Sequence, residues 1–401
     1  MMNQFAIPRQ PRNPDCADSM SVAERELAAF FAAVKELFGS ELAELSAEEW
    51  LRELETTNDL PASTPEWQRL TAKASLWLAN RVNALSLTTE FATTQEENMR
   101  IFVTGATGFI GSAIVRELIE AGYEVLGLAR SDKAAASLAR AGAKVHPGSL
   151  EDLESLRSGA AATDGVIHTA FIHEFNNYGP AVEADQRAIE TIGTALQRSG
   201  RPMIVTSGLA LLVPGRLATE EDAPSPDFPR KSEQTAMEFA SRGVRASVVR
   251  LPFSVHGDGD HGFVPRLIQV AREKGISAYI GDGLNRWPAV HRLDAARLYR
   301  LVLEKGSTGA RYHGIGDEGV PTREIAEVIG RRLDVPVANK SQEQAAEHFG
   351  WIGMFFGMGV LVSSSLTTEK LGWRPTHVGL IDDLETGSYF KTETIAAALQ
   401  S

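Results

Sequence analysis

The pattern of apolar and polar positions changes in character near residue 99. After this point short apolar runs, typical of buried parallel strands, alternate with longer segments whose apolar residues recur at helical spacing. We expect strands over 100–104, 124–129, 144–146, 165–169, 203–206 and 246–250, and helices over 112–121, 132–141, 150–156, 180–198 and 230–242. This alternation predicts an α/β fold with a doubly wound parallel sheet.

The first part of the chain has a different pattern. Residues 1–20 lack periodicity and contain three prolines, so we expect a disordered tail. Capping signals and apolar residues at helical spacing predict three helices within 21–87, and the polar residues 88–98 predict a linker. Residues 1–98 contain 16 acidic and 8 basic side chains. This helical segment is either an accessory interaction or oligomerisation module or an extension without catalytic purpose.

Three glycines follow the first predicted strand at intervals of three residues, in the stretch T-G-A-T-G-F-I-G. Gly105 permits a tight turn, and Gly108 allows the backbone to approach a pyrophosphate without a Cβ. Gly111 allows the following helix to pack closely on the strand. The helix would present unpaired N–H groups and a partial positive charge to phosphates. The stretch therefore predicts a nucleotide-binding turn.

This glycine spacing, with Thr104 before it and Phe109 and Ile110 inside it, resembles the fingerprint of extended and atypical short-chain dehydrogenase/reductases, including the NAD-dependent epimerase/dehydratase-like members. The resemblance covers about residues 99–396 and implies a Rossmann-type domain with a small C-terminal substrate-capping region over about 251–396. Segments 250–257 and 287–294 also resemble family segments. The cofactor-binding positions that we carry over are Gly105, Thr107, Gly108, Phe109, Ile110, Gly111, Ser149, Leu150, Thr169, Ala170 and Phe171. Ser149 replaces an aspartate of the family, which weakens the match beside the adenine.

Cofactor choice depends on the residues after the second predicted strand, Arg130 and Ser131. An acidic residue there holds the ribose hydroxyls of NAD, whereas a 2′-phosphate needs a cation. The guanidinium of Arg130 can bind a phosphate, so we expect NADP(H) to be preferred. The alternative is a solvated arginine at a strand end, and nearby Asp132 then favours NAD(H).

The usual catalytic pair of the family, a tyrosine with a lysine four residues later, is absent, because none of the six tyrosines has such a lysine. Ser207 matches the serine that positions a carbonyl in the family. Arg230 and Lys231 occupy the region of the missing motif, where they hold ribose or polarise a substrate oxygen unless they are a solvated basic pair. Tyr178, which we expect in the loop after the fourth strand, is the candidate proton donor, with His173 as the alternative.

Other features of the sequence bear on the possible functions. A formal net charge of −12 argues against sequence-independent nucleic-acid binding, so we expect a small-molecule substrate. No apolar run is long enough to span a membrane, and the single cysteine excludes an internal disulfide, so we expect a cytoplasmic protein. The histidines lack metal-ligand spacing, and His168 reads as a hydrogen-bonded core residue; we therefore expect no metal. The aromatic stretch 351–358 either roofs the substrate pocket or belongs to a core or a homo-oligomer surface.

These observations predict an NAD(P)-dependent oxidoreductase or epimerase-like enzyme that acts on a small carbonyl or alcohol, with an atypical active site. The alternative is a catalytically inactive dinucleotide-binding sensor or interaction protein, which the absent tyrosine and the additional helical segment favour. Turnover of NADPH with carbonyl compounds distinguishes the two.

Overall fold

The computed structural model describes residues 98–173, 178–209, 216–225 and 227–391. All of them belong to the second of two units, Glu97–Ser401. The predicted tail, the helical segment 21–87 and all but the last residue of the predicted linker lie outside the described residues. The fold below is therefore that of the second unit.

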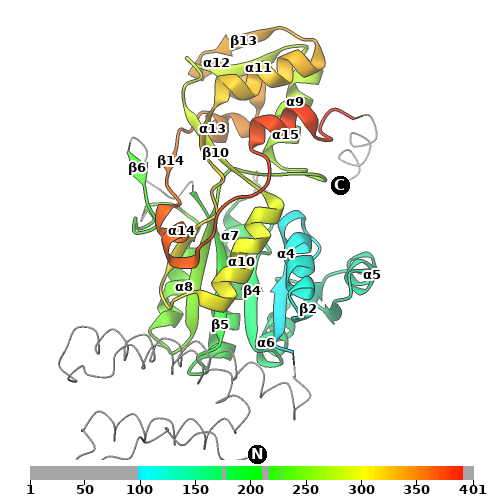
Figure 1. Ribbon diagram of the computed structural model, residues 1–401, viewed down its shortest axis with the longest axis vertical. Helices are drawn as coiled ribbons and strands as arrows, with labels where there is room; N and C mark the ends of the chain where they lie inside the picture. The colour runs from blue at the N-terminus through cyan, green and yellow to red at the C-terminus, as the bar shows by residue number, and fades with distance from the viewer. Residues whose placement is uncertain (1–97, 174–177, 210–215, 226, 392–401) are drawn as a thin grey trace, which may run out of the picture. The chain divides into compact units, whose positions relative to one another are not determined.

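The central element is a seven-stranded sheet in the order β11-β7-β5-β4-β1-β2-β3, in which every pair of neighbours is parallel (Figure 1). The chain order reverses between β1 and β4, and ligands bind at such switch points of open α/β sheets. The predicted doubly wound fold is thus confirmed. The strands are β1 (Arg100–Thr104), β2 (Glu124–Ala129), β3 (Lys144–Pro147), β4 (Gly165–His168), β5 (Pro202–Gly208), β7 (Arg245–Leu251) and β11 (Arg311–His313).

Helices cover both faces of this sheet and bury its apolar side chains in two separate cores. One core includes side chains of α4 (Phe109–Glu120) and α10 (Arg292–Lys305), and α5 (Asp132–Arg140) contributes Leu138 to it. The other includes side chains of α6 (Leu153–Ala161), α7 (Tyr178–Leu196) and α8 (Ser232–Ala240). The strands are buried on both sides, which explains their nearly continuous apolar sequences.

Several predicted helix boundaries are wrong, because the chain caps its helices at positions that apolar spacing does not reveal. Helix α4 begins at Phe109 rather than at residue 112, with extended Gly108 as its N-cap. Helix α6 begins at Leu153 rather than at residue 150, because the Asp152 side chain accepts a hydrogen bond from the amide of Ser155. Leu150 consequently lies in the turn before the helix.

Two boundary corrections concern candidate site residues. Helix α7 begins at Tyr178, so this tyrosine is the first helical residue and does not lie in a loop. Helix α8 begins at Ser232, which leaves Arg230 before the helix and Lys231 at its N-cap. Both residues therefore belong to the segment that leads into the helix.

The remaining elements build a second lobe beyond the main sheet, with its own core (Figure 1). Its strands are β8 (Ser254–His256), β10 (Arg286–His291) and β12 (Asp317–Pro321) in one sheet, and β9 (Ser277–Ile280) with β13 (Val337–Lys340) in another. Its helices are α9 (Phe263–Lys274), α11 (Thr322–Leu333), α12 (Gln342–Phe349), α13 (Ile352–Phe356) and α15 (Leu380–Thr386). The short strands β6 (Leu217–Ala218) and β14 (Leu361–Val362) pair with each other, and α14 (Ser365–Leu371) follows.

The chain passes between the two lobes more than once. After β10 it returns to the main sheet as α10 and β11, and after β14 it returns again as α14, whose Leu371 lies in the core under α10. The region 251–396 is therefore not one continuous capping segment, since parts of it complete the lobe of the main sheet.

We predict that Gly111→Ala destabilises the protein. A Cβ at Gly111 would lie 2.0 Å from the carbonyl oxygen of Gly105, so the turn or the helix must move. Overpacking of this kind typically costs about 1–3 kcal/mol, partly offset by the better helix propensity of alanine. Urea unfolding measures the change. Gly179→Ala is the control, because its Cβ would meet nothing within 4 Å, and an equal effect of both substitutions would contradict the packing argument.

Candidate cofactor and active site

The glycine turn lies against the end of β4. Gly105 has a φ of +67°, and a Cβ there would lie 2.7 Å from both the amide nitrogen of Ala170 and Oγ1 of Thr169. Thr169 donates to the carbonyl of Thr104 at 2.8 Å, and the amide of Ala170 donates to Oγ1 of Thr104 at 3.4 Å. Only glycine meets both the conformational and the steric demand at this position.

The amino end of α4 fits a pyrophosphate. Its N-cap, Gly108, makes no side-chain capping bond, and the turn is closed by the amide of Gly108, which donates to the carbonyl of Gly105 at 2.9 Å. Thr107 and Gly108 are exposed, whereas Phe109 and Ile110 are half-buried in the first turn. A helix end of this kind attracts anions through its N–H groups and its dipole.

The ends of β2 and β3 supply the residues expected near the adenosine part of a dinucleotide. Arg130 is exposed directly after β2. The Ser131 hydroxyl accepts from the amide of Ala134 and caps α5, while that of Ser149 accepts from the amides of Glu151 and Asp152, both at 3.3 Å. The two serines therefore have local roles in shaping the backbone, and Arg130 is an exposed cation at this edge.

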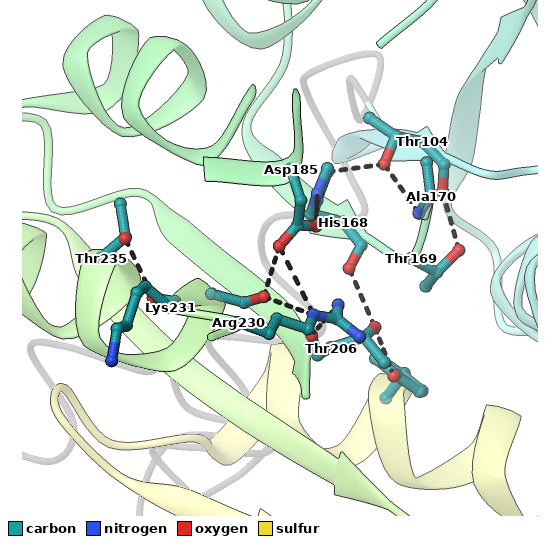
Figure 2. A network of polar contacts seen from close by, with 11 residues as sticks. Thr104, His168, Thr169, Ala170, Asp185, Thr206, Arg230, Lys231 and Thr235 are labelled. Carbon is teal, nitrogen blue, oxygen red and sulfur yellow. Dashed lines mark hydrogen bonds and ion pairs between the residues drawn. The ribbon is translucent and has the colours of Figure 1, made fainter. Parts of the chain in front are cut away.

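A buried carboxylate joins β4, and through it β1, to the start of α8 (Figure 2). Asp185 of α7 is 1% exposed and accepts a hydrogen bond from Ser232, while one of its oxygens lies 3.5 Å from Nε of Arg230. Its other oxygen lies 3.3 Å from Nε2 of His168. Arg230 in turn donates to Ser232 at 2.6 Å and to the carbonyl of Thr206 in β5 at 3.2 Å.

His168 continues this network to β1. Its Nδ1 lies 2.8 Å from Oγ1 of Thr104, and its ring is buried. A carboxylate only accepts, so the Nε2–H of His168 donates to Asp185, while Nδ1 of the same ring is hydrogen-bonded to the Thr104 hydroxyl. Because the ring is held in this way, the prediction that His168 is a hydrogen-bonded core residue is confirmed.

The charge of Asp185 is stabilised by its neighbours. Burial raises the pKa of this carboxyl group, but the positive charge of Arg230 and the hydrogen bonds from His168 and Ser232 outweigh burial, so the net pKa lies below its usual value. Asp185 is therefore ionised at neutral pH, and Arg230 is held in place by that charge.

The aromatic candidate residues lie close to Arg230. Its guanidinium lies 4.0 Å from the centre of the Phe171 ring, and that ring lies 6.0 Å from Tyr178 and 5.5 Å from His173, measured between ring centres. Burial raises the pKa of the Tyr178 phenol, against the opposing effect of Arg230. Burial and then the charge of Arg230 lower the pKa of His173. The structure thus brings together four residues from three separate segments.

Ser207 and Lys231 differ in their placement. Ser207 lies in β5, is 2% exposed, and its buried hydroxyl oxygen has no hydrogen-bond partner. Lys231 accepts a hydrogen bond from Thr235 at its carbonyl, and Figure 2 shows its side chain directed away from the Asp185 network. Ser207 directly follows Thr206, whose carbonyl accepts a hydrogen bond from Arg230. The side chain of Lys231 is directed away from the residues around Arg230.

Sequence reasoning missed Asp185, Ser232 and Tyr299. The hydroxyl of Tyr299 on α10 lies 2.6 Å from Oγ1 of Thr206, which also donates to the carbonyl of His168 at 2.9 Å. One signal was available for Asp185, since it is an acidic residue between apolar residues on the buried face of the predicted helix 180–198. Nothing in the sequence indicated its partners.

Two findings concern other classes of site. Within the part of the chain that the structure describes, no group of three or more histidine, cysteine, aspartate or glutamate side chains could hold a metal ion. Among the same residues, no helix has both the length and the apolar character needed to cross a membrane.

Sequence comparisons find relatives of this chain among known proteins. A model of the NAD dependent epimerase/dehydratase family matches residues 101–204. An uncharacterized protein of Schizosaccharomyces pombe is 55% identical over 295 residues, which cover 73% of this chain and 100% of the relative. The 4-hydroxy-2-methyl-3-oxo-4-farnesyl-3,4-dihydroquinoline-1-oxide ketoreductase of Stigmatella aurantiaca is 28% identical over 272 residues, which cover 63% of this chain and 80% of the relative.

A solved structure shares the fold. The dTDP-glucose 4,6-dehydratase DesIV of Streptomyces venezuelae, with NAD and TYD bound, superimposes with a TM-score of 0.61 at 22% identity. The match covers 75% of this chain and 98% of DesIV.

We predict that Asp185→Asn destabilises the fold in a pH-dependent way. The pKa of Asp185 is lowered on folding, so its charge stabilises the protein above the ordinary pKa of aspartate, and this contribution is lost as the pH falls through the native pKa. Urea unfolding at pH 7 should show a loss of about 3 kcal/mol, because one partner of a buried pair is removed. The difference from the wild type should shrink below a pH of about 4.

The control for this prediction is Glu183→Gln, an exposed position on the same helix. It should change the free energy of unfolding little at any pH. A loss for Asp185→Asn that stays constant across the acidic range would show that the charge of Asp185 does not stabilise the fold.

Proposed function

The chain belongs to the NAD-dependent epimerase/dehydratase family, and from this premise we propose that it is an NADPH-preferring oxidoreductase that interconverts a small carbonyl compound and its alcohol. The observation that carries the proposal is the hydroxyl of Ser207, which is buried without a partner at the carboxyl edge of the sheet. An unsatisfied buried hydroxyl costs stability, typically about 1–3 kcal/mol, unless a ligand completes it. A carbonyl oxygen is a suitable partner.

A nicotinamide cofactor held at the glycine turn would supply the hydride chemistry of this reaction. Ser207 donates a hydrogen bond to the substrate oxygen and orients it. Arg230, fixed by Asp185 and by the carbonyl of Thr206, adds a positive charge that favours negative charge on that oxygen during reduction. Because these groups are held in place before substrate binds, they need little reorganisation.

Tyr178 is the proton donor in this proposal. Its raised pKa keeps the phenol protonated at neutral pH, which suits the direction of carbonyl reduction. In the usual active site of this superfamily a lysine lowers the tyrosine pKa; here burial has the larger effect and Arg230 opposes it. The reverse reaction, which needs a phenolate, should therefore be favoured only at high pH.

The second candidate function is dinucleotide binding without catalysis. It is favoured by the contacts of Arg230, which bonds to Ser232 and to the carbonyl of Thr206 and pairs with Asp185. An arginine occupied in this way can serve the fold alone. Binding of the cofactor without turnover of any carbonyl compound would support this function.

The test of the proposed function is Ser207→Ala. We expect kcat for NADPH-dependent reduction of a carbonyl panel to fall about a hundredfold, because one donor to the substrate oxygen is lost. Cofactor affinity should stay unchanged, and thermal stability should stay equal or rise, since the unpartnered hydroxyl is removed. Ser241→Ala, at an exposed position, is the control. Unchanged turnover in Ser207→Ala would exclude this residue from the reaction.

Cofactor choice is tested at Arg130. A guanidinium gains charge-assisted hydrogen bonds only from the cofactor that carries a 2′-phosphate. Such bonds contribute about 1.5–3 kcal/mol, so Arg130→Ala should reduce the preference for NADPH over NADH by roughly tenfold to a hundredfold. Fluorescence titration of both cofactors measures it, with Arg140→Ala at the exposed end of α5 as the control. Equal losses for the two cofactors would mean that Arg130 only stacks on the adenine.

A further inference from the structure

Four half-buried aromatic side chains form one cluster in the second lobe. Phe263, the first residue of α9, lies at its centre, with ring centres 5.4 Å from Phe355, 5.7 Å from Trp351 and 6.5 Å from Phe253. These residues come from the connection between β7 and β8, from the start of α9, and from α13 and its N-cap. We call them the aromatic cluster.

The cluster rests on a rigid base. Trp287 of β10 is fully buried, and its ring centre lies 4.8 Å from that of Phe253 and 5.8 Å from that of Phe263. Its indole N–H donates to the hydroxyl of Ser254 at 2.6 Å, so no polar group is left unsatisfied. Phe356 packs beneath Trp287, with 5.2 Å between ring centres. The four outer rings are thus held in fixed positions while part of their surface stays accessible.

The cluster begins beside the proposed reaction centre. Strand β7 pairs with β5 so that Leu251 is opposite Gly208, the residue after Ser207. Phe253 follows Leu251 by two residues and packs against the small apolar group that contains Leu209. Phe253 also packs against the core of the second lobe. It therefore connects the end of β5 to the rest of the aromatic cluster.

We propose that the aromatic cluster is the substrate-binding surface and that the substrate is a carbonyl compound carrying a flat aromatic ring. This inference rests on the proposed reductase activity, because it assumes that Ser207 holds the carbonyl group. Aromatic rings attract one another in tilted and edge-to-face arrangements at centre distances of about 4.5–7 Å, which is the geometry that the cluster already has. A further ring would extend it in the same way.

The chemistry of the cluster is poorly suited to a nucleotide-sugar substrate. A diphosphate is recognised by bidentate arginine pairs or by helix ends, whereas the four rings present apolar faces and edges. An accessible apolar patch next to a reaction centre is the usual form of a pocket for an apolar ligand. The alternative is that a second copy of this chain covers the cluster. The experiment below distinguishes the two.

The experiment compares two ketones of similar size, phenyl methyl ketone and cyclohexyl methyl ketone, with the full-length protein and NADPH. We expect kcat/KM to be about three- to tenfold higher for the phenyl compound, which corresponds to the usual gain from one aromatic pair. Phe263→Leu and Phe355→Leu should each lower kcat/KM for the phenyl compound more than kcat/KM for the cyclohexyl compound, and so remove most of this preference.

The matched control is Tyr279→Leu. This half-buried ring lies in the same lobe, beneath the guanidinium of Arg323 and outside the cluster, so its removal should leave the preference unchanged. Thermal melting of each variant shows whether the fold is retained. Isothermal calorimetry with the two ketones and sedimentation of each variant provide readouts that do not need turnover.

The outcomes separate the inference from the proposed function. If no carbonyl compound is reduced but phenyl methyl ketone binds and loses affinity in Phe355→Leu, the aromatic site stands and the reductase activity falls. If ketones are reduced without an aromatic preference, or if a nucleotide sugar is the better substrate, the aromatic site is wrong. Variants that change only the sedimentation of the protein would identify the cluster as a contact between copies, which also overturns it.

Discussion

The arrangement of the site depends on one buried charge, the carboxylate of Asp185. A charge in the interior is tolerated only when it is paired and hydrogen-bonded, and Asp185 has three partners from two parts of the chain, the end of β4 and the start of α8. Through His168 it is connected to Thr104 in β1, beside the glycine turn, and through Arg230 it is connected to Thr206 in β5. A single side chain of α7 thereby holds the cofactor turn and the proposed reaction centre in register.

A second buried ion pair joins β7 to α8. Arg250 of β7 is fully buried and donates to both oxygens of Glu233 in the first turn of α8, at 2.9 and 2.7 Å. It also lies 3.2 Å from Nε2 of His313, whose amide nitrogen donates to Thr367 of α14. The segment that positions Arg230 is thus attached from both sides, by Asp185 at one end and by Arg250 at the other. The return of α14 to the main sheet completes this second network.

These two networks fix the groups that take the place of the usual tyrosine and lysine in the proposed active site. In that pair a lysine four residues further along the same helix lowers the pKa of the tyrosine, so both groups come from a single local motif. Here the cation, Arg230, precedes α8, and the phenol of Tyr178 belongs to the first turn of α7. Phe171, between them, contacts both. An active site divided among three segments can form only when those segments are fixed by buried polar bonds.

Periodicity was sufficient to predict the parallel sheet, and glycine spacing was sufficient to predict the tight turn after β1, because each depends on local chemistry. The candidate residues Ser207, Arg230 and Tyr178 came instead from the resemblance to a family, and their roles stay predictions. Buried parallel strands are apolar throughout, and the turn needs glycine for steric reasons that act within a few residues. Helix starts such as those at Phe109 and Ser232 were misplaced by two or three residues, because a cap is decided by single hydrogen bonds rather than by apolar spacing.

The tertiary structure alone decided which of the candidates meet. Asp185 lies 17 residues after His168 and 47 residues before Ser232, and no local pattern specifies contacts over such separations. Phe253 and Phe355, likewise, become neighbours only when the second lobe folds. The sequence was sufficient to recognise residue types suited to the proposed reaction. Their spatial arrangement could not be predicted, because it arises from the packing of whole helices on the sheet.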